Sequence, residues 1–228
     1  MEAILLAAGE GIRLRPYTLL TPKPLFTIKG IPLITYHIDR LNNLGIENSK
    51  IYCVVNYLKE EISGYLKRFH YGVNIIEQKD KKGTAAAAEA VKDFISEKEI
   101  LIVYADTYFE DDLKEFIKYD WAIGVAEAED VSKFGKIISE NGYLKEIKEK
   151  SEKGKEKIFA GILKVKKEFF EVLDKIKPNE KSGEYYLTDA ILIQNSKTPF
   201  KVYKLKGFWF DIGNEKNLKA ARNRKAYI

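Results

Sequence analysis

The sequence is poor in the residue types that carry most nucleophilic and metal chemistry. It contains one cysteine and two histidines among 228 residues. Cys53 lies in the apolar stretch Ile51–Val55 without a second cysteine, which favours a buried residue in a reducing compartment over a disulfide. His37 and His70 lie on predicted helices with no cluster of ligands around them, so neither indicates a metal site. No persuasive Ser/His/Asp or Cys/His arrangement is present.

Long apolar runs and one-sided charge are missing as well. No apolar run approaches the roughly eighteen residues that a membrane-spanning helix needs, and no cleavable signal pattern is present. Lys and Arg total 39 against 34 Asp and Glu, a formal net charge of +5, with both signs interspersed. No basic block with interleaved aromatic residues occurs, which argues against nucleic-acid binding. The sequence predicts a cytoplasmic protein that binds neither nucleic acid nor membrane.

The stretch Ala3–Leu25 has the features of a polyphosphate site. Ile4-Leu5-Leu6 is a short apolar run, typical of a strand that is buried on both faces. It stops at Ala7-Ala8-Gly9-Glu10-Gly11, whose small residues let backbone N–H groups converge on one point, as in a phosphate-binding nest. Arg13 follows, and Lys23 lies between two prolines that restrict the backbone beside it. We therefore predict a polyphosphate cradle, with Lys23 exposed and little packed.

Two familiar glycine loops do not fit this stretch. The pattern Gly9-x-Gly11-x-x-Leu14 lacks the third glycine of a dinucleotide-binding fingerprint, and Pro16 follows too soon for a clean helix start. No Gly-Lys-Ser/Thr occurs, which excludes a P-loop. The remaining alternative is a tight turn with two incidental cations, and the combination of Arg13 with the proline-flanked lysine disfavours it.

Strand and helix patterns alternate through the first half of the chain. Strands are predicted at 4–6, 50–55, 73–76 and 100–103, and helices at 32–44, 60–69 and 84–95. This alternation predicts an α/β fold with a doubly wound, mostly parallel, Rossmann-like sheet flanked by helices. Ligands of such sheets bind at the carboxyl ends of the strands, where the loop after the first strand, Gln78 and Asp106 all fall.

The second half of the chain has a different pattern. It predicts strands at 121–126, 135–139, 142–148, 157–166, 202–205 and 208–210 and a helix at 186–195. Asn141-Gly142 is a hairpin turn signal, and Asn214 is suited to the N-cap of a closing helix. We expect an antiparallel β extension over the pocket. Without an internal repeat or a linker, residues 1–228 are predicted to form a single domain.

The stretch Ala3–Leu25 resembles the signature of the sugar-1-phosphate nucleotidylyltransferases. That signature reads approximately L-A-A-G-x-G-x-R-L-x-P-x-T, followed by P-K-P-L, and Ile12 stands where the family usually has Thr or Ser. Further motifs follow in family order: Gln78 with Gly83-Thr84-Ala85, Tyr104-Ala105-Asp106, Phe134-Gly135, Glu149-Lys150-Ser151, Ala160-Gly161-Ile162, Gly183–Ile191 and Trp209–Gly213. The chain departs from these motifs at Ala105, where glycine is usual, and at Phe159, where asparagine is usual.

The resemblance implies a single domain for nucleotidyl transfer. A phosphate oxygen of a sugar-1-phosphate would attack the α-phosphorus of a nucleoside triphosphate and release pyrophosphate, leaving a nucleotide sugar. Positioning and cations dominate such a reaction, and no side-chain nucleophile is required. Gln78 could pair with a pyrimidine edge through an amide that donates and accepts, with Gly83 letting backbone atoms reach the base. We therefore favour UTP or dTTP.

The resemblance also assigns roles to individual residues. Asp106 and Asp211 would hold Mg²⁺, the expected cofactor, while Arg13 and Lys23 would neutralise the triphosphate and the departing pyrophosphate. The nucleotide-binding residues implied are Leu6, Ala7, Ala8, Gly9, Gly11, Arg13, Lys23, Gln78, Gly83, Thr84, Tyr104 and Asp106. The sugar-phosphate-binding residues implied are Gly135, Glu149, Lys150 and Gly161. Lys150 would hold the phosphate and Glu149 a sugar hydroxyl. Asp211, between two apolar residues, is expected to be buried.

Three other interpretations stay open. A cytidylyl- or guanylyltransferase acting on phosphocholine, inositol phosphate or mannose-1-phosphate is favoured by Phe159, because a sugar hydroxyl would lose its usual partner. A non-catalytic sensor of nucleotide sugars and an unrelated α/β binding module are the others. The chain ends soon after the closing helix, so we expect neither the hexapeptide-repeat β-helix of some family members nor an acyltransferase activity. A homo-oligomer is left open.

Overall fold

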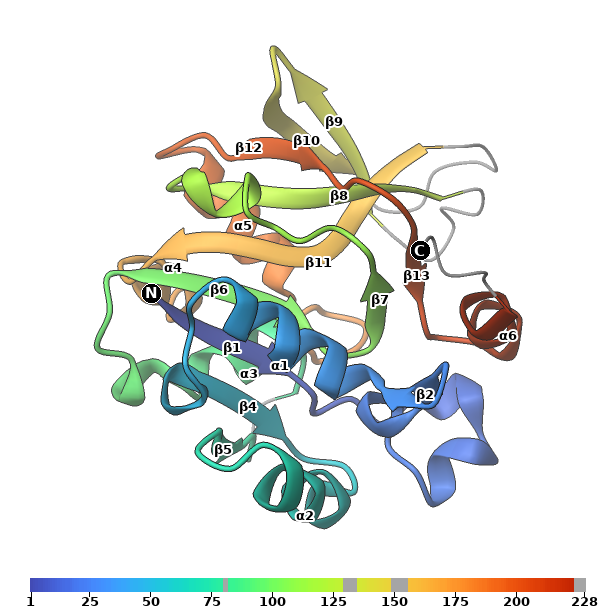
Figure 1. Cartoon of the computed structure of the whole chain (residues 1–228). Helices are drawn as coiled ribbons and strands as arrows, with labels where there is room; N and C mark the ends of the chain where they lie inside the picture. The colour runs from blue at the N-terminus through green and yellow to red at the C-terminus, as the bar shows by residue number, and fades with distance from the viewer. Residues whose placement is uncertain (80–81, 129–134, 149–155, 224–228) are drawn as a thin grey trace.

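The computed structural model describes residues 1–79, 82–128, 135–148 and 156–223, and these residues form a nine-stranded mixed sheet at the centre of the molecule (Figure 1). From one edge to the other the strands are β5 (Asn74–Glu77), β4 (Ile51–Val55), β1 (Glu2–Leu6), β6 (Glu99–Tyr104), β11 (Glu156–Lys166), β8 (Ala122–Ala128), β12 (Lys201–Lys204), β10 (Tyr143–Lys148) and β9 (Lys136–Glu140). Each predicted strand of this sheet begins and ends within two residues of its predicted bounds.

The strands β5, β4, β1 and β6 form the parallel half of the sheet. Every residue of β1 and β4 is buried, as expected of short apolar strands covered on both faces. Because all four strands run the same way, their carboxyl ends lie at one edge. The predicted α/β fold class is confirmed.

The antiparallel half continues the same sheet. Residues Ile162–Lys166 of β11 pair antiparallel with β6. On its other side β11 pairs antiparallel with β8 from Glu156 to Phe159 and again at Leu163 and Lys164. β10 pairs antiparallel with β9, and β12 runs parallel to β8. The extension therefore lies beside the parallel strands, joined to them through β11.

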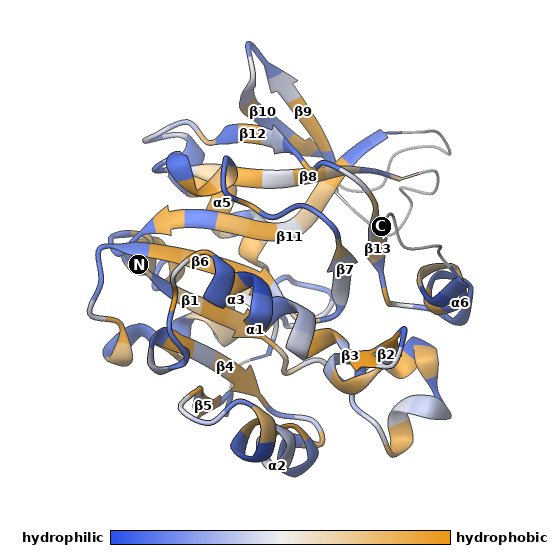
Figure 2. Cartoon of the chain, viewed as in Figure 1, coloured by the Kyte–Doolittle hydropathy of each residue, from blue (hydrophilic) through white to orange (hydrophobic). Residues whose placement is uncertain are grey.

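Helices cover both faces of the sheet. The apolar sides of α1 (Leu33–Asn43) and α2 (Lys59–Phe69) pack with alternate residues of β1 and β4 in one core cluster. On the other face, α3 (Thr84–Glu89), α4 (Phe169–Leu173) and α5 (Leu187–Asn195) pack in a second cluster. Figure 2 shows the hydrophobic strands between helices whose outer surfaces are hydrophilic. None of the described helices is long and apolar enough to cross a membrane.

The α3 helix is shorter than the sequence predicts. It ends at Glu89, and a 3₁₀ turn at Lys92–Phe94 follows where the alanine-rich pattern predicts helix up to residue 95. The Val91 N–H donates to the carbonyl three residues earlier, at 3.3 Å, so the turn tightens while Val91 and Ile95 stay in the core. Five further 3₁₀ turns lie at Ile12–Leu14, Tyr17–Leu19, Lys23–Leu25, Asn48–Lys50 and Phe116–Lys118 in the described part of the chain.

A two-stranded ribbon pairs a segment near the C-terminus with a segment from the middle of the chain. β7 (Thr107–Phe109) pairs antiparallel with β13 (Trp209–Asp211), and a small hairpin, β2 (Thr27–Ile28) with β3 (Ile31–Pro32), lies nearby. The closing helix α6 (Glu215–Asn223) begins after Asn214, whose Oδ1 accepts the Asn217 N–H at 2.9 Å. The predicted N-cap is confirmed. A third apolar cluster, which includes Leu14, Tyr108 and Leu218, joins ribbon, helix and N-terminal loop.

Candidate active site

A cavity of about 760 Å³ lies at the carboxyl ends of the parallel strands. Its wall comes from the segments that follow β1, β4, β5 and β6, together with the start of α3. All of the predicted nucleotide-binding residues line it: Leu6, Ala7, Ala8, Gly9, Gly11, Arg13, Lys23, Gln78, Gly83, Thr84, Tyr104 and Asp106. The volume is in the range of small-molecule sites in proteins.

The loop after β1 has its shape fixed by contacts with later residues. The Ala7 N–H donates to the Val54 carbonyl at 2.9 Å, which extends the pairing of β1 with β4 into the loop. Thr18 Oγ1 donates to the Gly11 carbonyl at 2.9 Å. Gly11 has φ +68°, and an added Cβ would lie 2.9 Å from Thr18 Cγ2 and 3.0 Å from Lys23 Cε. Both the backbone conformation and the close packing therefore require glycine here.

Lys23 is buried against this glycine, and the prediction of an exposed lysine is wrong. Lys23 is 8% exposed, and its Nζ donates to Asp106 Oδ2 at 2.8 Å. The two prolines do hold the backbone, because Lys23 opens the 3₁₀ turn Lys23–Leu25. From that turn the aliphatic stem of Lys23 passes over Gly11 and forms part of the cavity wall. The ammonium at its end reaches the Asp106 carboxylate.

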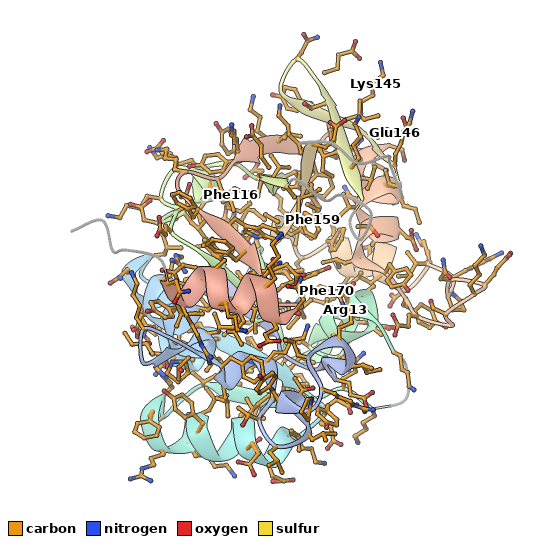
Figure 3. The ribbon with its side chains drawn as sticks, turned by 90° about the vertical axis from the view of Figure 1, so that its right-hand side faces the viewer. Arg13, Phe116, Lys145, Glu146, Phe159 and Phe170 are labelled. Carbon is orange, nitrogen blue, oxygen red and sulfur yellow. The ribbon has the colours of Figure 1, made fainter. Side chains whose placement is uncertain are left out.

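Arg13 and Asp211 form a second, looser ion pair. Arg13 Nη2 lies 3.9 Å from Asp211 Oδ2, and Asp211 is 7% exposed, as the sequence predicts. An added Cβ at Gly213 would overlap the Asp211 carboxylate and lie 2.9 Å from Arg13 Nη2. Glycine at this position therefore leaves room for both charged groups. Arg13 lies near the centre of the view in Figure 3, far from Lys145 and Glu146 on the outer hairpin.

The β7–β13 ribbon brings the two aspartates to neighbouring positions. Asp211 is the register partner of Thr107, and the Ile212 N–H donates to the Asp106 carbonyl at 2.9 Å. Asp106 lines the cavity directly, whereas Asp211 lies beside it through its pair with Arg13. The structure thus brings together all four residues of the predicted catalytic set.

The α1 helix holds this ribbon in place. Arg40 donates to the Asp111 and Phe109 carbonyls, both at 2.7 Å, and its guanidinium lies 4.1 Å from the centre of the Phe109 ring. The buried His37 Nε2 lies 2.9 Å from the Thr107 carbonyl, where the ring nitrogen donates. Burial, followed by the nearby Arg40 charge, lowers the pKa of His37 to about 3. His37 is therefore a neutral structural residue, in agreement with the sequence analysis.

Gln78 is fixed at the wall of the cavity by its backbone and its side chain. Its N–H donates to the Val55 carbonyl at 2.9 Å, and its own carbonyl accepts from Asn56 Nδ2 at 2.6 Å. The side-chain Nε2 donates to the Gly83 carbonyl at 3.1 Å, and the residue is 7% exposed. One of the two amide hydrogens that could meet a base is therefore engaged within the protein.

Backbone and side-chain hydrogen bonds join the segment before α5 to the loop that contains Gly83 and to the start of α3. The Ala85 N–H donates to the Tyr185 carbonyl and the Tyr185 N–H to the Lys82 carbonyl, both at 2.9 Å, while Thr84 Oγ1 accepts the Leu187 N–H at 2.9 Å. Gly83 has φ +102°, and an added Cβ would overlap the Tyr185 carbonyl oxygen. The structure thus gives this glycine a packing role, different from the approach to the base that the sequence suggests.

The predicted sugar-phosphate residues are not gathered around this cavity in the described part of the chain. Gly161 (φ +76°) lies at an irregularity of β11, where an added Cβ would be 2.8 Å from the Tyr104 ring. Gly135 packs against Ile147 instead. Glu149 and Lys150 lie outside the described residues. The Phe159 ring meets Tyr104 edge to face, with centroids 5.7 Å apart, and burial raises the pKa of that tyrosine.

Several lining residues were missed by the sequence analysis. Asn56 and Tyr57 follow β4 directly, as Gln78 follows β5, so the rule for carboxyl ends of parallel strands could have found them. Lys82 and Glu184 line the cavity only because the segment before α5 folds onto the loop at Gly83, and no sequence pattern signals that contact. The other additional lining residues are Glu10, Ile12, Pro24 and Ala87.

A small-residue loop after a parallel strand, with two cation–carboxylate pairs beside it, is typical of α/β proteins that bind phosphorylated ligands. The chain belongs to the nucleotidyl transferase family, whose model matches residues 2–226. The predicted membership of the sugar-1-phosphate nucleotidylyltransferases is confirmed by its relatives.

Two curated relatives and one solved structure illustrate the similarity. The bifunctional protein GlmU of Methanocaldococcus jannaschii is 41% identical over 218 residues, which cover 93% of this chain and 51% of that protein. The UTP–glucose-1-phosphate uridylyltransferase AglF of Haloferax volcanii is 31% identical over 238 residues, covering 98% and 96%. A UDP-glucose pyrophosphorylase complexed with UDP-glucose shares the fold, with a TM-score of 0.82, 24% identity and 97% of each chain covered. The chain spans about half the length of the GlmU relatives that it matches.

Proposed function

We propose that this chain transfers a nucleoside monophosphate from an NTP to a sugar-1-phosphate and releases pyrophosphate. The observation that carries the proposal is the convergence of two cations and two carboxylates beside the small-residue loop, with Lys23 Nζ 2.8 Å from Asp106 and Arg13 3.9 Å from Asp211. Two anionic reactants can approach one another only where their charge is offset, and a loop of fixed backbone donors can hold the phosphates in position.

The protein groups would act mainly by binding and orientation. Backbone N–H groups of the loop after β1 would contact the phosphates, as the approach of small residues permits. Lys23 and Arg13 would leave their aspartate partners for phosphate oxygens and offset the charge that builds on the departing pyrophosphate. The sugar-phosphate oxygen is itself the nucleophile, so no protein side chain needs to form a covalent intermediate.

The residues present fit a magnesium ion. Asp106 and Asp211 are brought to neighbouring positions by the Ile212–Asp106 backbone hydrogen bond, and they would hold the ion. No cluster of three or more His, Cys, Asp or Glu side chains suited to a metal occurs in the described residues. A site of two carboxylates that phosphate oxygens complete is what Mg²⁺ favours. When bound, the ion would offset phosphate charge and help to orient the two substrates.

UTP or dTTP is our preferred nucleotide. Gln78 is held at the cavity wall with one amide hydrogen on the Gly83 carbonyl, so a 180° flip would set two oxygens against each other. An amide held in one orientation can discriminate between the edges of the bases. The name of the Haloferax relative, a UTP-dependent enzyme, supports the same choice.

A specific observation keeps a second candidate. Phe159 occupies the position where the family usually has asparagine, and it packs edge to face on Tyr104, which lines the cavity. An apolar ring cannot hydrogen-bond a sugar hydroxyl, which suits an acceptor without ring hydroxyls, such as phosphocholine with CTP as donor. Inositol phosphate or mannose-1-phosphate, with CTP or GTP as donor, would need another partner for that hydroxyl.

The test is a matrix of five NTPs against a panel of phosphorylated acceptors, scored by release of pyrophosphate with and without Mg²⁺. We expect turnover with a sugar-1-phosphate and UTP or dTTP, at least tenfold above CTP and ATP. Best turnover with CTP or GTP and another acceptor would select the second candidate. Release of pyrophosphate from no pair in the matrix would overturn the proposed function.

A further inference from the structure

We propose that Asn56 is a positioning residue for base selection, which acts by holding the backbone of Gln78 at the cavity wall. The inference rests on the proposed function, since it concerns how the same cavity chooses its nucleotide. Asn56 lines the cavity directly after β4, and no motif of the sequence singles it out.

The first observation is where the pairing of β4 with β5 ends. β5 is an edge strand of the described sheet, and its register with β4 runs from Asn74 to Glu77. One further backbone bond follows, from the Gln78 N–H to the Val55 carbonyl at 2.9 Å. Asn56 Nδ2 then donates to the Gln78 carbonyl at 2.6 Å. A side chain thus extends the ladder by one bond, at the point where the chain leaves the edge strand for the cavity.

The second observation is that Asn56 is itself held by two regular elements. It follows the fully buried strand β4, and its carbonyl accepts the Lys59 N–H at 3.2 Å, where α2 begins. The backbone of Asn56 therefore has little freedom to drift, although the residue itself is exposed. The hydrogen bond to Gln78 therefore transfers the rigidity of β4 and α2 to an edge segment that would otherwise fray.

The third observation links this backbone to the group that would read the base. The Gln78 side chain is nearly buried and its Nε2 donates to the Gly83 carbonyl. With the backbone carbonyl fixed by Asn56 and the side-chain amide fixed by Gly83, the whole residue has one placement. Discrimination between base edges depends on such placement, because a shifted amide would meet each edge about equally well.

The experiment compares the ratios of kcat/KM and of Kd for UTP, dTTP, CTP and GTP in the wild type and in Asn56→Ala. We expect the preference for the best nucleotide over the others to shrink about fivefold, the usual effect of one lost hydrogen bond. Asn56→Asp keeps the side-chain shape but cannot donate, and it should shrink the preference as well. All four nucleotides carry the same triphosphate charge, so the added negative charge cancels in the ratio.

Asn74→Ala is the matched control. Asn74 Nδ2 donates to the Ser49 carbonyl at 2.8 Å and, more weakly, to the Ile51 carbonyl at 3.3 Å, at the opposite end of the same strand pair. Its removal takes a hydrogen bond of the same kind from β5, so a merely structural effect would appear equally in both variants. We expect Asn74→Ala to leave the nucleotide ratios unchanged.

A double-mutant comparison decides whether Asn56 acts through Gln78. In a Gln78→Ala background the backbone bond can still form, but the group that reads the base is gone, so Asn56→Ala should change the ratios no further. An equal loss of nucleotide preference in that background would overturn the inference, because Asn56 would then read the base itself.

Unchanged ratios in both folded Asn56 variants would overturn the inference too, as would a wild type without any preference. A protein that binds nucleotides selectively but transfers nothing would refute the proposed function alone, since the Kd ratios still report on Asn56.

Discussion

The four charged residues beside the loop after β1 form two ion pairs. Lys23 lies 2.8 Å from Asp106, and Arg13 lies 3.9 Å from Asp211. In the proposed reaction these partners would exchange, with the carboxylates turning to a magnesium ion and the cations to phosphate. The exchange keeps the local charge balanced, so neither the carboxylates nor the cations would lose a partner while the substrates bind.

Asp106→Asn and Asp211→Asn should each lower turnover by more than a hundredfold, because each removes a carboxylate that would hold Mg²⁺ in the proposed reaction. Binding of the nucleotide without Mg²⁺, measured by calorimetry, should change much less. Asp112→Asn, at an exposed position away from the cavity, is the control. Turnover within about threefold of the wild type, well under 1 kcal/mol in barrier, would rule out the metal role of the residue concerned.

Lys23→Ala should lower kcat by roughly a hundredfold or more, because it removes a cation that would bind phosphate in the proposed reaction. It should also cost about 1 kcal/mol of unfolding free energy, a modest value because the Asp106 carboxylate keeps partial access to water. Lys219→Ala, which breaks an exposed pair with Glu215, is the matched control for stability. Turnover that survives while stability collapses would show that Lys23 is only structural.

Sequence reasoning identified the chemistry of this site better than its packing. Arg13 and Lys23 are predicted from the local pattern after the first strand, Asp106 and Asp211 are assigned by the family resemblance, and the structure brings the four residues together. The burial of Lys23 was not foreseen, because it depends on Gly11 lying under the lysine stem, a contact set by the tertiary fold. For the same reason the carbonyl that holds the Gln78 amide could not be named from the sequence.

Among the elements, the loop that contains Gly83 depends on a partner distant in sequence. The segment before α5 donates to and accepts from this loop, and Gly83 lies directly against its backbone.

Gly83→Ala should cost about 1–3 kcal/mol of unfolding free energy, because φ +102° strains any side chain and the new Cβ would overlap the Tyr185 carbonyl. Nucleotide affinity should fall as well. Gly45→Ala is the matched control, since Gly45 also has a positive φ, +81°, but nothing lies within 4 Å of an added Cβ. Denaturant unfolding checks both variants, and equal losses would mean that backbone strain alone accounts for the effect.

At this scale the long apolar and alternating patterns predict their strands correctly, and the short strand expected at 208–210 is present as β13, whereas β2, β3 and β7 are not predicted. β7 has three residues and follows Asp106 without a break, so no periodicity could reveal it. The end of α3 at Glu89 was missed because alanine favours helix throughout, whereas the burial of Val91 and Ile95 tightens the turn.

For the molecule as a whole, His37 makes stability depend on pH. Its pKa is about 3 in the folded protein, lowered first by burial, against an ordinary value near 6.5. An unfolded chain takes up a proton below pH 6.5 that the folded protein refuses, so stability is present at neutral pH and is lost as pH falls toward 3. The slope from this group reaches about 1.4 kcal/mol per pH unit.

His37→Gln, which retains a side-chain donor for the Thr107 carbonyl, should remove that contribution. Urea unfolding at several pH values between 6.5 and 4 should give a shallower fall of unfolding free energy in the variant. Other titrating groups, His70 among them, are common to both proteins and cancel in the comparison. Parallel pH curves would contradict the prediction.

The order of strand and helix patterns along the chain predicts the fold class. It does not predict the order in which the strands lie in the sheet. A run of apolar strands separated by helices predicts a parallel sheet wherever it occurs. That β11 would join β6 to β8, and so turn two halves into one sheet, depends on long-range pairing that no local pattern reports.

The position of β5 at one end of the described sheet has a consequence for the fidelity of the proposed reaction. An edge strand exchanges its amide hydrogens sooner than a central one, because it opens locally without unfolding the core. Residues 74–78 should therefore show faster deuterium uptake than β1. If the base is read from this edge, the selectivity for the nucleobase would be lost at a lower temperature than the turnover itself. A preparation warmed toward its unfolding temperature would still turn over, yet its products would become mixed in their nucleobase.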